Sequence, residues 1–527
     1  MQRPMLKEIW WRWALLAVVV LGGLWLRIHD LSRVFLWLDE TDMFNEYVYG
    51  GHHKSLVDFA LYSRRATTIT WGWPGIVWVV SRTFGSTIAA ARMPTVFMSA
   101  AGVLALFGLV FYLLPRDLPG NRFWPAIFAA SLAAVSITQL ELSQRTFPYG
   151  AVPCMAAAIL LAHFHLLRAA APEWKYDARV GRAIVLYATV CSVTLCLHSS
   201  PALLIAVSVS FLGWSAARGL LRQPRNQRWK LMRLAICAGL IMAVAAVSNA
   251  KNPRYGYRPY IANYYGSLSA AAIPKTLAHA YDLATYHLNL FYNHALYWPE
   301  SLNAFLLPLV ALTVVGWGLA ASGRFGRLAR SFALLGTVAM AVPAMLSLVR
   351  IYPFGGVRQT LFLNPFLLSF AALGFYSLRG RWVTRLLGIA LAAGYLVGWG
   401  ANLPAFYRER HAAYSQQELV DTLKENGSLP IYAWGSEREL RYELRGHPEI
   451  QIQTLPQEST PPYLLICTHN WVGDDYWFRG YAEFLRRTGF KARLVKENPS
   501  WNRDSLGHSG SLYFPPNGLW IYKVTAN

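Results

Sequence analysis

Long apolar stretches, separated by short polar segments, recur along the first three quarters of this 527-residue chain. Eleven stretches are near spanning length: 13–29, 87–114, 124–141, 147–167, 183–198, 201–217, 234–249, 301–320, 331–349, 358–377 and 386–404. Because a helix needs about 20 apolar residues to cross a bilayer, the pattern predicts about eleven transmembrane helices. The first stretch is Trp-rich and no small-residue cleavage site follows it, so we interpret it as a retained helix rather than a signal peptide.

The pattern becomes polar near residue 405, which predicts a membrane domain over 1–404 and a soluble domain over 405–527. In this second part, helical patterns cover Ser415–Lys424, Glu437–Leu444 and Trp477–Thr488, and strand patterns cover 430–434, Tyr463–Cys467 and Leu519–Val524. A small α/β domain of this length can form its own core. It has no Gly-rich phosphate loop, so we assign it no chemistry of its own.

Charge distribution predicts which side each loop faces. Cations gather in alternate segments: Arg3/Lys7/Arg12, Arg116/Arg122, Arg168–Arg182, Arg218–Arg233, Arg324–Arg330 and Arg379–Arg385. Cytoplasmic loops carry the excess of Lys and Arg, so we expect the amino terminus inside. The loops 30–86 and 250–300 and the carboxyl-terminal domain are then expected outside.

Composition agrees with a membrane protein and excludes a nucleic-acid-binding one. The chain is 55% hydrophobic with a mean hydropathy of +0.28, and 14% of its residues are aromatic, as in proteins with interfacial aromatic belts. A net charge of +22 suggests nucleic acid in a soluble protein, but here the cations lie between apolar runs. The five cysteines form no CxxC pair, so neither a disulfide framework nor structural zinc is expected.

An acidic cluster follows the first apolar stretch, in a chain with only 27 acidic residues. Asp39, Glu40 and Asp42 lie where a membrane helix meets the outer face, and carboxylates there are costly unless they are solvated, paired or functional. A partly buried carboxylate is suited to act as a general base. The alternative is a helix start, with Asp39 as the N-cap and Asp42 favoured by the helix dipole.

A second candidate is the outer turn Ser143–Tyr149, between the third and fourth apolar stretches. Arg145 stands on the side of the membrane that is poor in cations, and its planar fork suits a phosphate. We take Arg145 and Tyr149 as candidate phosphate- and substrate-binding residues. The alternative for Arg145 is a side chain that extends to lipid headgroups.

A third candidate is the turn Tyr352–Gln359, where a Pro/Gly sequence leads to Arg358 at the outer end of the tenth stretch. Arg350 precedes it, and two glycines allow close approach of a ligand to the backbone. The alternative is a simple turn with an interfacial arginine. Arg64 and Arg258, in the two outer loops, are weaker candidates for a sugar phosphate, and headgroup anchoring is the favoured interpretation for them.

The histidines predict no metal site. His279, His287 and His294 share one loop, but their spacing is not that of a HExxH site. No cofactor is required for chemistry at a phosphate, because arginines can take the place of a cation there. A divalent cation at the acidic cluster is the one exception left open.

Taken together, these motifs resemble the GT-C superfamily of integral-membrane glycosyltransferases, and especially its protein O-mannosyltransferase and aminoarabinose (lipid A) transferase branch. The resemblance covers about residues 10–405. It depends on the acidic pair Asp39-Glu40, on "AARMPTVFMSA", on "ELSQRTFPYGA" and on "YPFGGVRQTLFLNPFLL". Phe147 stands directly before Pro148 where the family often has Arg.

The resemblance implies a fold, a donor and a set of roles. The fold is a polytopic helical one, and the donor is a polyprenyl-phosphate sugar used on the periplasmic face. The short loops, and termini without a eukaryotic retention signal, favour a bacterial inner membrane. Asp39 is expected to deprotonate an acceptor hydroxyl in an inverting displacement, with Glu40 or Asp42 orienting it. Arg358, and secondarily Arg145, is expected to neutralise the departing phosphate. The acceptor is a lipid, a glycan or a protein.

Two other classes of membrane protein remain as alternatives. A polysaccharide polymerase or ligase shares the lipid-linked donor, but it is expected to have one very large outer loop rich in Arg and His, which 250–300 matches only in part. A transporter or flippase usually shows inverted repeats and mid-membrane ionisable residues in broken helices, and neither is visible in this sequence.

Overall fold

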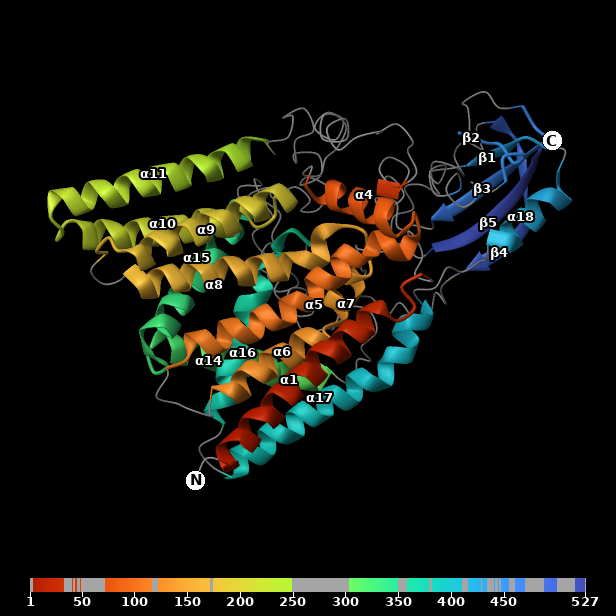
Figure 1. The fold of residues 1–527 in the computed structure, drawn as a ribbon. Helices are drawn as coiled ribbons and strands as arrows, with labels where there is room; N and C mark the ends of the chain where they lie inside the picture. The colour runs from red at the N-terminus through yellow and green to blue at the C-terminus, as the bar shows by residue number, and fades with distance from the viewer. Residues whose placement is uncertain are drawn as a thin grey trace, which may run out of the picture.

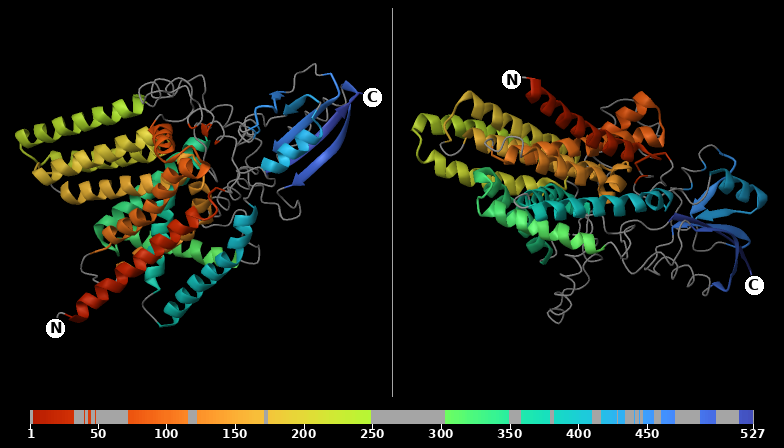
Figure 2. Two further views of the ribbon diagram at one scale, coloured as in Figure 1. Left: turned by 45° about the vertical axis from the view of Figure 1, so that its right-hand side comes forward. Right: turned by 90° about the horizontal axis from the view of Figure 1, so that it is seen from below.

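The computed structural model of the chain describes residues 3–32, 40, 43–44, 48, 72–115, 122–170, 174–248, 303–348, 358–378, 382–409, 416–427, 429–433, 440, 444, 447–454, 460–469, 488–499 and 517–526. Its helices form an elongated bundle, and a five-stranded sheet lies beyond one end of it (Figures 1 and 2). We call this the sheet end. The opposite end, where the first helix begins, is called the amino-terminal end.

Helices account for nearly all of the bundle. The long ones are α1 (Arg3–Ile28), α5 (Ile88–Leu113), α8 (Val152–Ala170), α9 (Ala178–Leu197), α10 (Ala202–Leu220), α11 (Arg225–Ser248), α14 (Asn303–Ala321), α15 (Gly326–Leu348) and α17 (Trp382–Glu409). The shorter ones are α4 (Gly72–Phe84), α6 (Phe123–Val135), α7 (Ile137–Ser143) and α16 (Asn364–Ser377), with the 3-10 turns η2 (Pro148–Ala151) and η6 (Arg358–Leu363). Each of the eleven apolar stretches falls on a helix, so the predicted helical pattern is confirmed.

Eight described segments are long and apolar enough to cross a membrane, from Trp10–Ile28 to Thr360–Ser377. The apolar helices at Phe123–Val135 and Leu309–Ala321 are shorter. The predicted fold class, a multi-pass helical membrane protein with a small carboxyl-terminal sheet, is confirmed. Which end of the bundle faces the cytoplasm stays a prediction.

Helix α4 lies inside the predicted outer loop 30–86. Its residues Trp73 and Val77 are one turn apart and fully buried, and they pack with Phe44 and Met155 at the sheet end of the bundle. At 13 residues the helix is too short to span a bilayer, so a search for spanning lengths does not detect it.

Polar caps define where several of the helices begin. Thr87 accepts a hydrogen bond from Ala90 N at the start of α5, and Asp177 accepts from two backbone amides at the start of α9. Ser136 separates α6 from α7, and its hydroxyl accepts from Gln139 N. Each cap satisfies amides that have no partner within their own helix. The break at Ser136 divides the apolar stretch 124–141 into two helices.

Helices α14 and α16 pack in close contact because each has a glycine at their crossing. A Cβ on Gly374 would overlap the carbonyl oxygen of Leu312, and one on Gly316 would overlap that of Phe370. Small residues let helix backbones approach closely in membrane proteins, where packing contributes much of the association energy.

Replacing Gly374 by Ala is therefore expected to destabilise the bundle by about 1–3 kcal/mol, the usual cost of overpacking. The measurement is the thermal unfolding temperature in detergent. Gly318→Ala on α14 is the matched control, because open space surrounds its Cβ position. Since alanine favours helix more than glycine does, this control should unfold at an equal or slightly higher temperature. Equal unfolding temperatures for both variants and the wild type would contradict the close crossing.

The sheet has the strand order β2-β1-β3-β5-β4. Its strands are β1 (Ile431–Ala433), β2 (Ile452–Thr454), β3 (Tyr463–His469), β4 (Lys491–Pro499) and β5 (Asn517–Thr525), and the helix α18 (Gln416–Glu425) precedes them. β1 is parallel to β2 and β3, and β5 is antiparallel to β3 and β4. Leu419, Val420 and Leu423 of α18 are buried in the same cluster as the central strands.

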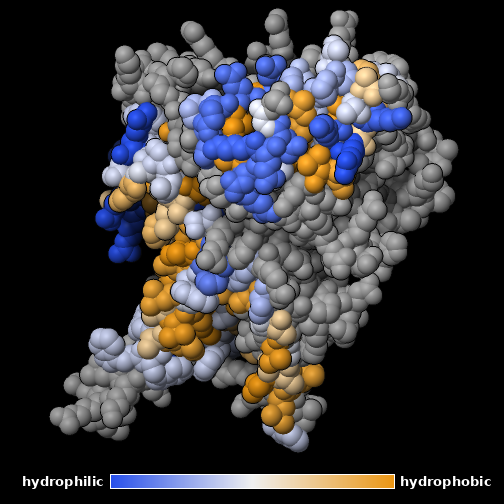
Figure 3. All heavy atoms as spheres, turned by 90° about the vertical axis from the view of Figure 1, so that its right-hand side faces the viewer, coloured by the Kyte–Doolittle hydropathy of each residue, from blue (hydrophilic) through white to orange (hydrophobic). Residues whose placement is uncertain are grey.

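These elements confirm the predicted helix over Ser415–Lys424 and the predicted strands at 430–434, Tyr463–Cys467 and Leu519–Val524. Strands β2 and β4 were not predicted. The predicted helices Glu437–Leu444 and Trp477–Thr488 lie largely outside the described residues. Viewed from the sheet end, hydrophilic side chains gather in the upper part, where the carboxyl-terminal sheet lies, and hydrophobic ones lie below along the helices (Figure 3). The division into two domains stays a prediction.

Candidate active site

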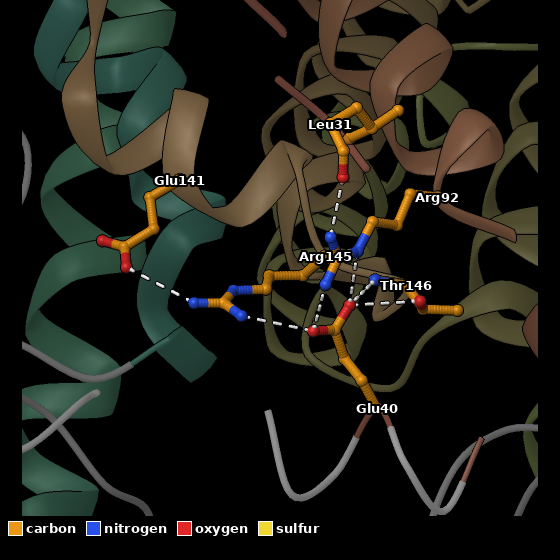
Figure 4. A network of polar contacts seen from close by, with 6 residues as sticks. All are labelled: Leu31, Glu40, Arg92, Glu141, Arg145 and Thr146. Atoms are coloured by element: carbon orange, nitrogen blue, oxygen red, sulfur yellow. Dashed lines mark hydrogen bonds and ion pairs between the residues drawn. The ribbon is translucent and has the colours of Figure 1, made fainter. Parts of the chain in front are cut away.

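A buried carboxylate, that of Glu40, is the centre of a polar cluster at the sheet end (Figure 4). Arg92 of α5 donates to both of its oxygens, at 3.1 Å from Nε and 2.9 Å from Nη2. Arg145 donates from Nη1 to Oε2 at 3.2 Å. Thr146 donates to Oε1 from its backbone N at 2.6 Å and from its hydroxyl at 3.1 Å. The fork of Arg92 thus binds Glu40 in the bidentate manner that guanidinium and carboxylate favour.

The two arginines of the cluster are themselves held from other sides. Arg92 also donates to the carbonyl oxygen of Leu31, beyond the end of α1, at 2.8 Å. Arg145 lies 3.9 Å from a carboxylate oxygen of Glu141 in α7. Both arginines are buried: the exposed fraction of the residue is 0% for Arg92 and 1% for Arg145. Burial excludes the alternative in which Arg145 extends to lipid headgroups.

The turn from Gln144 to Phe147 places Arg145 and Thr146 at Glu40. The indole of Trp73, in α4, donates to the carbonyl oxygen of Thr146 at 2.7 Å, and Thr95 Oγ1 donates to that of Phe147 at 3.3 Å. Pro148 then starts η2 with its fixed φ. A Cβ at Gly150 would meet the backbone of Leu142 and Ser143, so only glycine lets the turn fold back this closely.

A second group of buried hydrogen bonds, made by Arg27 and Gln144, holds the end of α1 in place. Arg27 donates to Ser99 Oγ at 2.8 Å and to the carbonyl oxygens of Ala133 and Ala134 at 3.0 Å. Those carbonyls belong to the last turn of α6, where helical partners are lacking. Gln144 Nε2 donates to His29 O at 2.8 Å. Side chains of α1 and of the Gln144 turn therefore tie α1, α5 and α6 together.

The electrostatics of the cluster keep Glu40 ionised. Burial by itself disfavours the charged carboxylate, but Arg92 and Arg145 and the hydrogen bonds from Arg92 and from the Thr146 amide outweigh it. Together they lower the pKa of Glu40 from its ordinary value of 4.5 to about 2. A carboxylate with this pKa is a poor proton acceptor at neutral pH, so its geometry suits a positioning role better than that of a base.

This pKa predicts how the stability depends on pH. Because the pKa of Glu40 is lower in the folded state, its ionised form stabilises the fold fully above about pH 4.5 and loses that contribution as pH falls towards 2. The lowering corresponds to about 3 kcal/mol. We expect the difference in unfolding temperature between wild type and Glu40→Gln to stay constant from pH 8 to pH 5.5. A difference that shrinks within that window would contradict the low pKa.

The structure brings some of the predicted site residues together. Tyr149 is half-buried in η2, with its ring stacked on Phe147 and edge-on to His198. Arg358 is the first residue of η6, and η6 contacts η2 and α8. The side chain of Arg358 lies outside the described part of the chain, as do the predicted site residues Asp39, Asp42, Arg64, Arg258 and Arg350.

Arg92 and Arg27 are site residues that sequence reasoning missed. Both are ionisable residues inside apolar helices, and such residues are costly enough to be functional candidates by default. Arg92 also lies within the "AARMPTVFMSA" motif that carries the family resemblance. The signal was therefore present, although only the tertiary structure pairs Arg92 with Glu40.

Among the residues that the structure describes, no three His, Cys, Asp or Glu side chains are placed to hold a metal ion. Both oxygens of Glu40 accept from guanidinium, amide or hydroxyl donors, which suits a structural carboxylate rather than a metal ligand. Asp39 and Asp42 are outside the described residues, so a divalent cation at the acidic cluster stays a prediction.

Comparison with known proteins identifies the fold. No family model and no curated protein sequence matches the chain. Among solved structures it is similar to ArnT from Cupriavidus metallidurans in the apo state, with a TM-score of 0.50 and 12% identity over 98% of each chain. ArnT with undecaprenyl phosphate gives a TM-score of 0.48, with 12% identity over 96% of this chain and 97% of that one. The oligosaccharyltransferase AglB from Archaeoglobus fulgidus also gives 0.48, with 11% identity over 88% of this chain and 70% of that one. This chain therefore has the fold of the GT-C integral-membrane glycosyltransferases.

Proposed function

We propose that this protein is a membrane glycosyltransferase that moves a sugar from a polyprenyl-phosphate carrier to an acceptor on the extracytoplasmic face. The observation that carries the proposal is the buried Glu40–Arg92–Arg145 cluster, at one end of a helical bundle with the fold of ArnT. A buried ion pair by itself is weak evidence for stability, and its best use is to fix a particular local arrangement. In this protein the ion pairs of Glu40 with Arg92 and Arg145 hold Glu40, within the acidic segment, in one position.

The catalytic base in this proposal is Asp39. It is covalently joined to Glu40, and Cα atoms joined by a trans peptide are about 3.8 Å apart. Anchoring Glu40 on two arginines and the Thr146 amide therefore limits where the backbone of Asp39 lies. In this proposal Glu40 is a positioning residue, and Asp39 accepts the proton. Asp42 is the second candidate to orient the acceptor.

The reaction is a single inverting displacement. An acceptor oxygen attacks the anomeric carbon as its proton passes to the Asp39 carboxylate, and the bond from that carbon to the phosphate oxygen breaks. Polyprenyl phosphate leaves with the electron pair, so charge develops on the phosphate. Arg358 at the start of η6 is the first candidate to stabilise this charge. Arg145 is the weaker candidate, because Glu40 and Glu141 already draw on its charge.

The location and the substrates are part of the same proposal. Nucleotide sugars are confined to the cytoplasm, so an active site at an outward-facing sheet end requires a donor carried across on lipid. The proposed setting is a bacterial inner membrane, with the amino terminus cytoplasmic and the carboxyl-terminal sheet periplasmic. The acceptor is a lipid, a glycan or a protein, and the proposal includes a contribution of the carboxyl-terminal sheet to its binding.

The test is transfer by the purified full-length protein in nanodiscs. A panel of undecaprenyl-phosphate sugars is supplied, since ArnT has been solved with undecaprenyl phosphate bound. Mass spectrometry follows consumption of the donor and release of undecaprenyl phosphate. We expect consumption of at least one donor, unaffected by EDTA. The absence of both binding and consumption across the panel would overturn the proposal and favour a transporter, or a polymerase that uses a diphosphate-linked oligosaccharide.

A further inference from the structure

Cations lie over aromatic rings repeatedly at the amino-terminal end of the bundle, away from the Glu40 cluster. The described pairs are Arg122 on Phe111 at 3.9 Å, Arg168 on Tyr112 at 4.1 Å, Arg218 on Trp214 at 4.6 Å, Arg12 on Trp11 at 5.5 Å and Lys230 on Tyr176 at 5.8 Å. These distances run from the cation to the ring centroid. The residues involved lie in the last turns of α5 and α8, near the end of α10, in the first half of α1, directly before α6 and α9, and in the second turn of α11. Arg12 also lies over Phe123, at 5.9 Å. The remaining described pair, Arg82 on Trp78, is in α4 at the sheet end.

Two of these pairs share one place at the end of α5. Phe111 and Tyr112 are consecutive residues in its last turn, and they receive guanidinium groups from two different helices. Arg122 comes from the start of α6, and Arg168 comes from the last turn of α8 and also donates to Tyr112 O at 3.4 Å. The exposed ring of His165 has its centroid 6.5 Å from that of Tyr112. We call Arg122 and Arg168 the α5 cation pair.

A guanidinium that lies over a ring keeps its charge and much of its donor capacity. The ring face meets the flat side of the group, while the N–H bonds point outwards in the guanidinium plane. Those N–H groups suit the oxygens of a phosphate, which accepts two parallel hydrogen bonds from such a fork. Arg168 is exposed and Arg122 is half-buried, so both are accessible at the surface.

Apolar surface lies beside the α5 cation pair. Leu104 of α5 is 46% exposed and Trp124 of α6 is 47% exposed, on the two helices that carry Phe111 and Arg122. In a multi-pass membrane protein such side chains face acyl chains. A ligand for this place therefore has a phosphate at one end and a hydrocarbon tail at the other.

We propose that the α5 cation pair binds the headgroup of an anionic phospholipid, such as phosphatidylglycerol, with its acyl chains along α5 and α6. Basic sites between membrane helices recognise such headgroups. This inference does not depend on the transfer reaction. It assigns a lipid site at the end of the bundle opposite Glu40.

Native mass spectrometry of the detergent-purified full-length protein tests this directly. Dioleoyl-phosphatidylglycerol or dioleoyl-phosphatidylcholine is added, and bound lipids are counted. We expect wild type to retain phosphatidylglycerol over phosphatidylcholine. The double variant Arg122→Gln/Arg168→Gln should lower the occupancy of the phosphatidylglycerol adduct about tenfold or more, as the loss of two such cations predicts. No preference for phosphatidylglycerol in the wild type would overturn the proposal.

The matched control is Arg179→Gln/Arg182→Gln. It removes the same charge from exposed positions in the first turns of α9, at the same end of the bundle. This control should keep the adduct, and an equal loss in both double variants would reduce the effect to overall charge and overturn the site. Arg122→Lys/Arg168→Lys covers the case in which the Gln variant does not fold. It keeps both charges and should retain an adduct of intermediate occupancy, whereas complete loss with intact folding would contradict headgroup binding.

Discussion

Replacing Asp39 by Asn is expected to lower turnover of the lipid-linked donor by about two to four orders of magnitude, the usual contribution of a positioned general base. The amide has nearly the shape of the carboxylate but cannot accept the proton of an acceptor hydroxyl. Folding and donor binding should remain near those of wild type, because the described ion pairs of the buried cluster are made by Glu40, which this variant keeps. The measurement combines single-turnover transfer, donor binding and thermal unfolding on the same preparation.

Asp177→Asn provides the matched control for Asp39→Asn. Asp177 caps α9 at the amino-terminal end, and Asn caps helices as well as Asp does. The same carboxylate-to-amide change far from the cluster should leave turnover unchanged. Near-normal turnover by Asp39→Asn would remove Asp39 from the mechanism, and Asp42→Asn would then be the next variant to measure.

The second large effect is expected at Glu40, and it is one of stability. Glu40→Gln leaves the buried guanidinium groups of Arg92 and Arg145 facing a neutral amide, and its NH₂ group faces donors rather than acceptors. Removing one partner of a buried ion pair costs about 3–5 kcal/mol. The unfolding temperature in detergent should fall sharply, and activity should fall with it, because the segment that carries Asp39 loses its anchor.

Glu141→Gln is the comparison for this effect. Glu141 also approaches Arg145, but at 3.9 Å, beyond hydrogen-bond range, and nearly all of the contacts to the cluster remain without it. Its substitution should lower the unfolding temperature much less than Glu40→Gln does. Together, the Asp39 and Glu40 variants separate chemistry from positioning: the first loses turnover and keeps stability, and the second loses both. A Glu40→Gln protein as stable and active as wild type would contradict the positioning role.

The partners of Glu40 explain why the roles of the three acidic residues are hard to assign from the sequence. Three carboxylates within four residues look alike in a one-dimensional pattern. In the structure Glu40 has Arg92 from 52 positions later and Arg145 from 105 positions later. Those partners favour an anchoring role for Glu40, because a low pKa makes a carboxylate a good anchor and a poor base.

The role of Arg145 was also hard to predict from sequence, because it depends on burial. Its position in an outer turn poor in cations favoured either a phosphate ligand or a headgroup contact. The fold instead buries it between Glu40 and Glu141, which leaves Arg358 as the stronger candidate for the phosphate. The sequence predicts that Arg145 lies in an outer turn, but it does not show how deeply the side chain is buried in the bundle.

The sequence by itself determined the long apolar helices, because a bilayer demands long apolar runs with internally satisfied backbones and each run carries its own signal. It also determined α18 and three of the strands, whose patterns are local. The tertiary structure decided what is not local: the short helix α4 that holds Thr146 through Trp73, the glycine crossing at Gly374, and the pairing of Arg92 with Glu40. The physical reason is that burial and ion pairing depend on which distant segments meet, and no window of neighbouring residues contains that information.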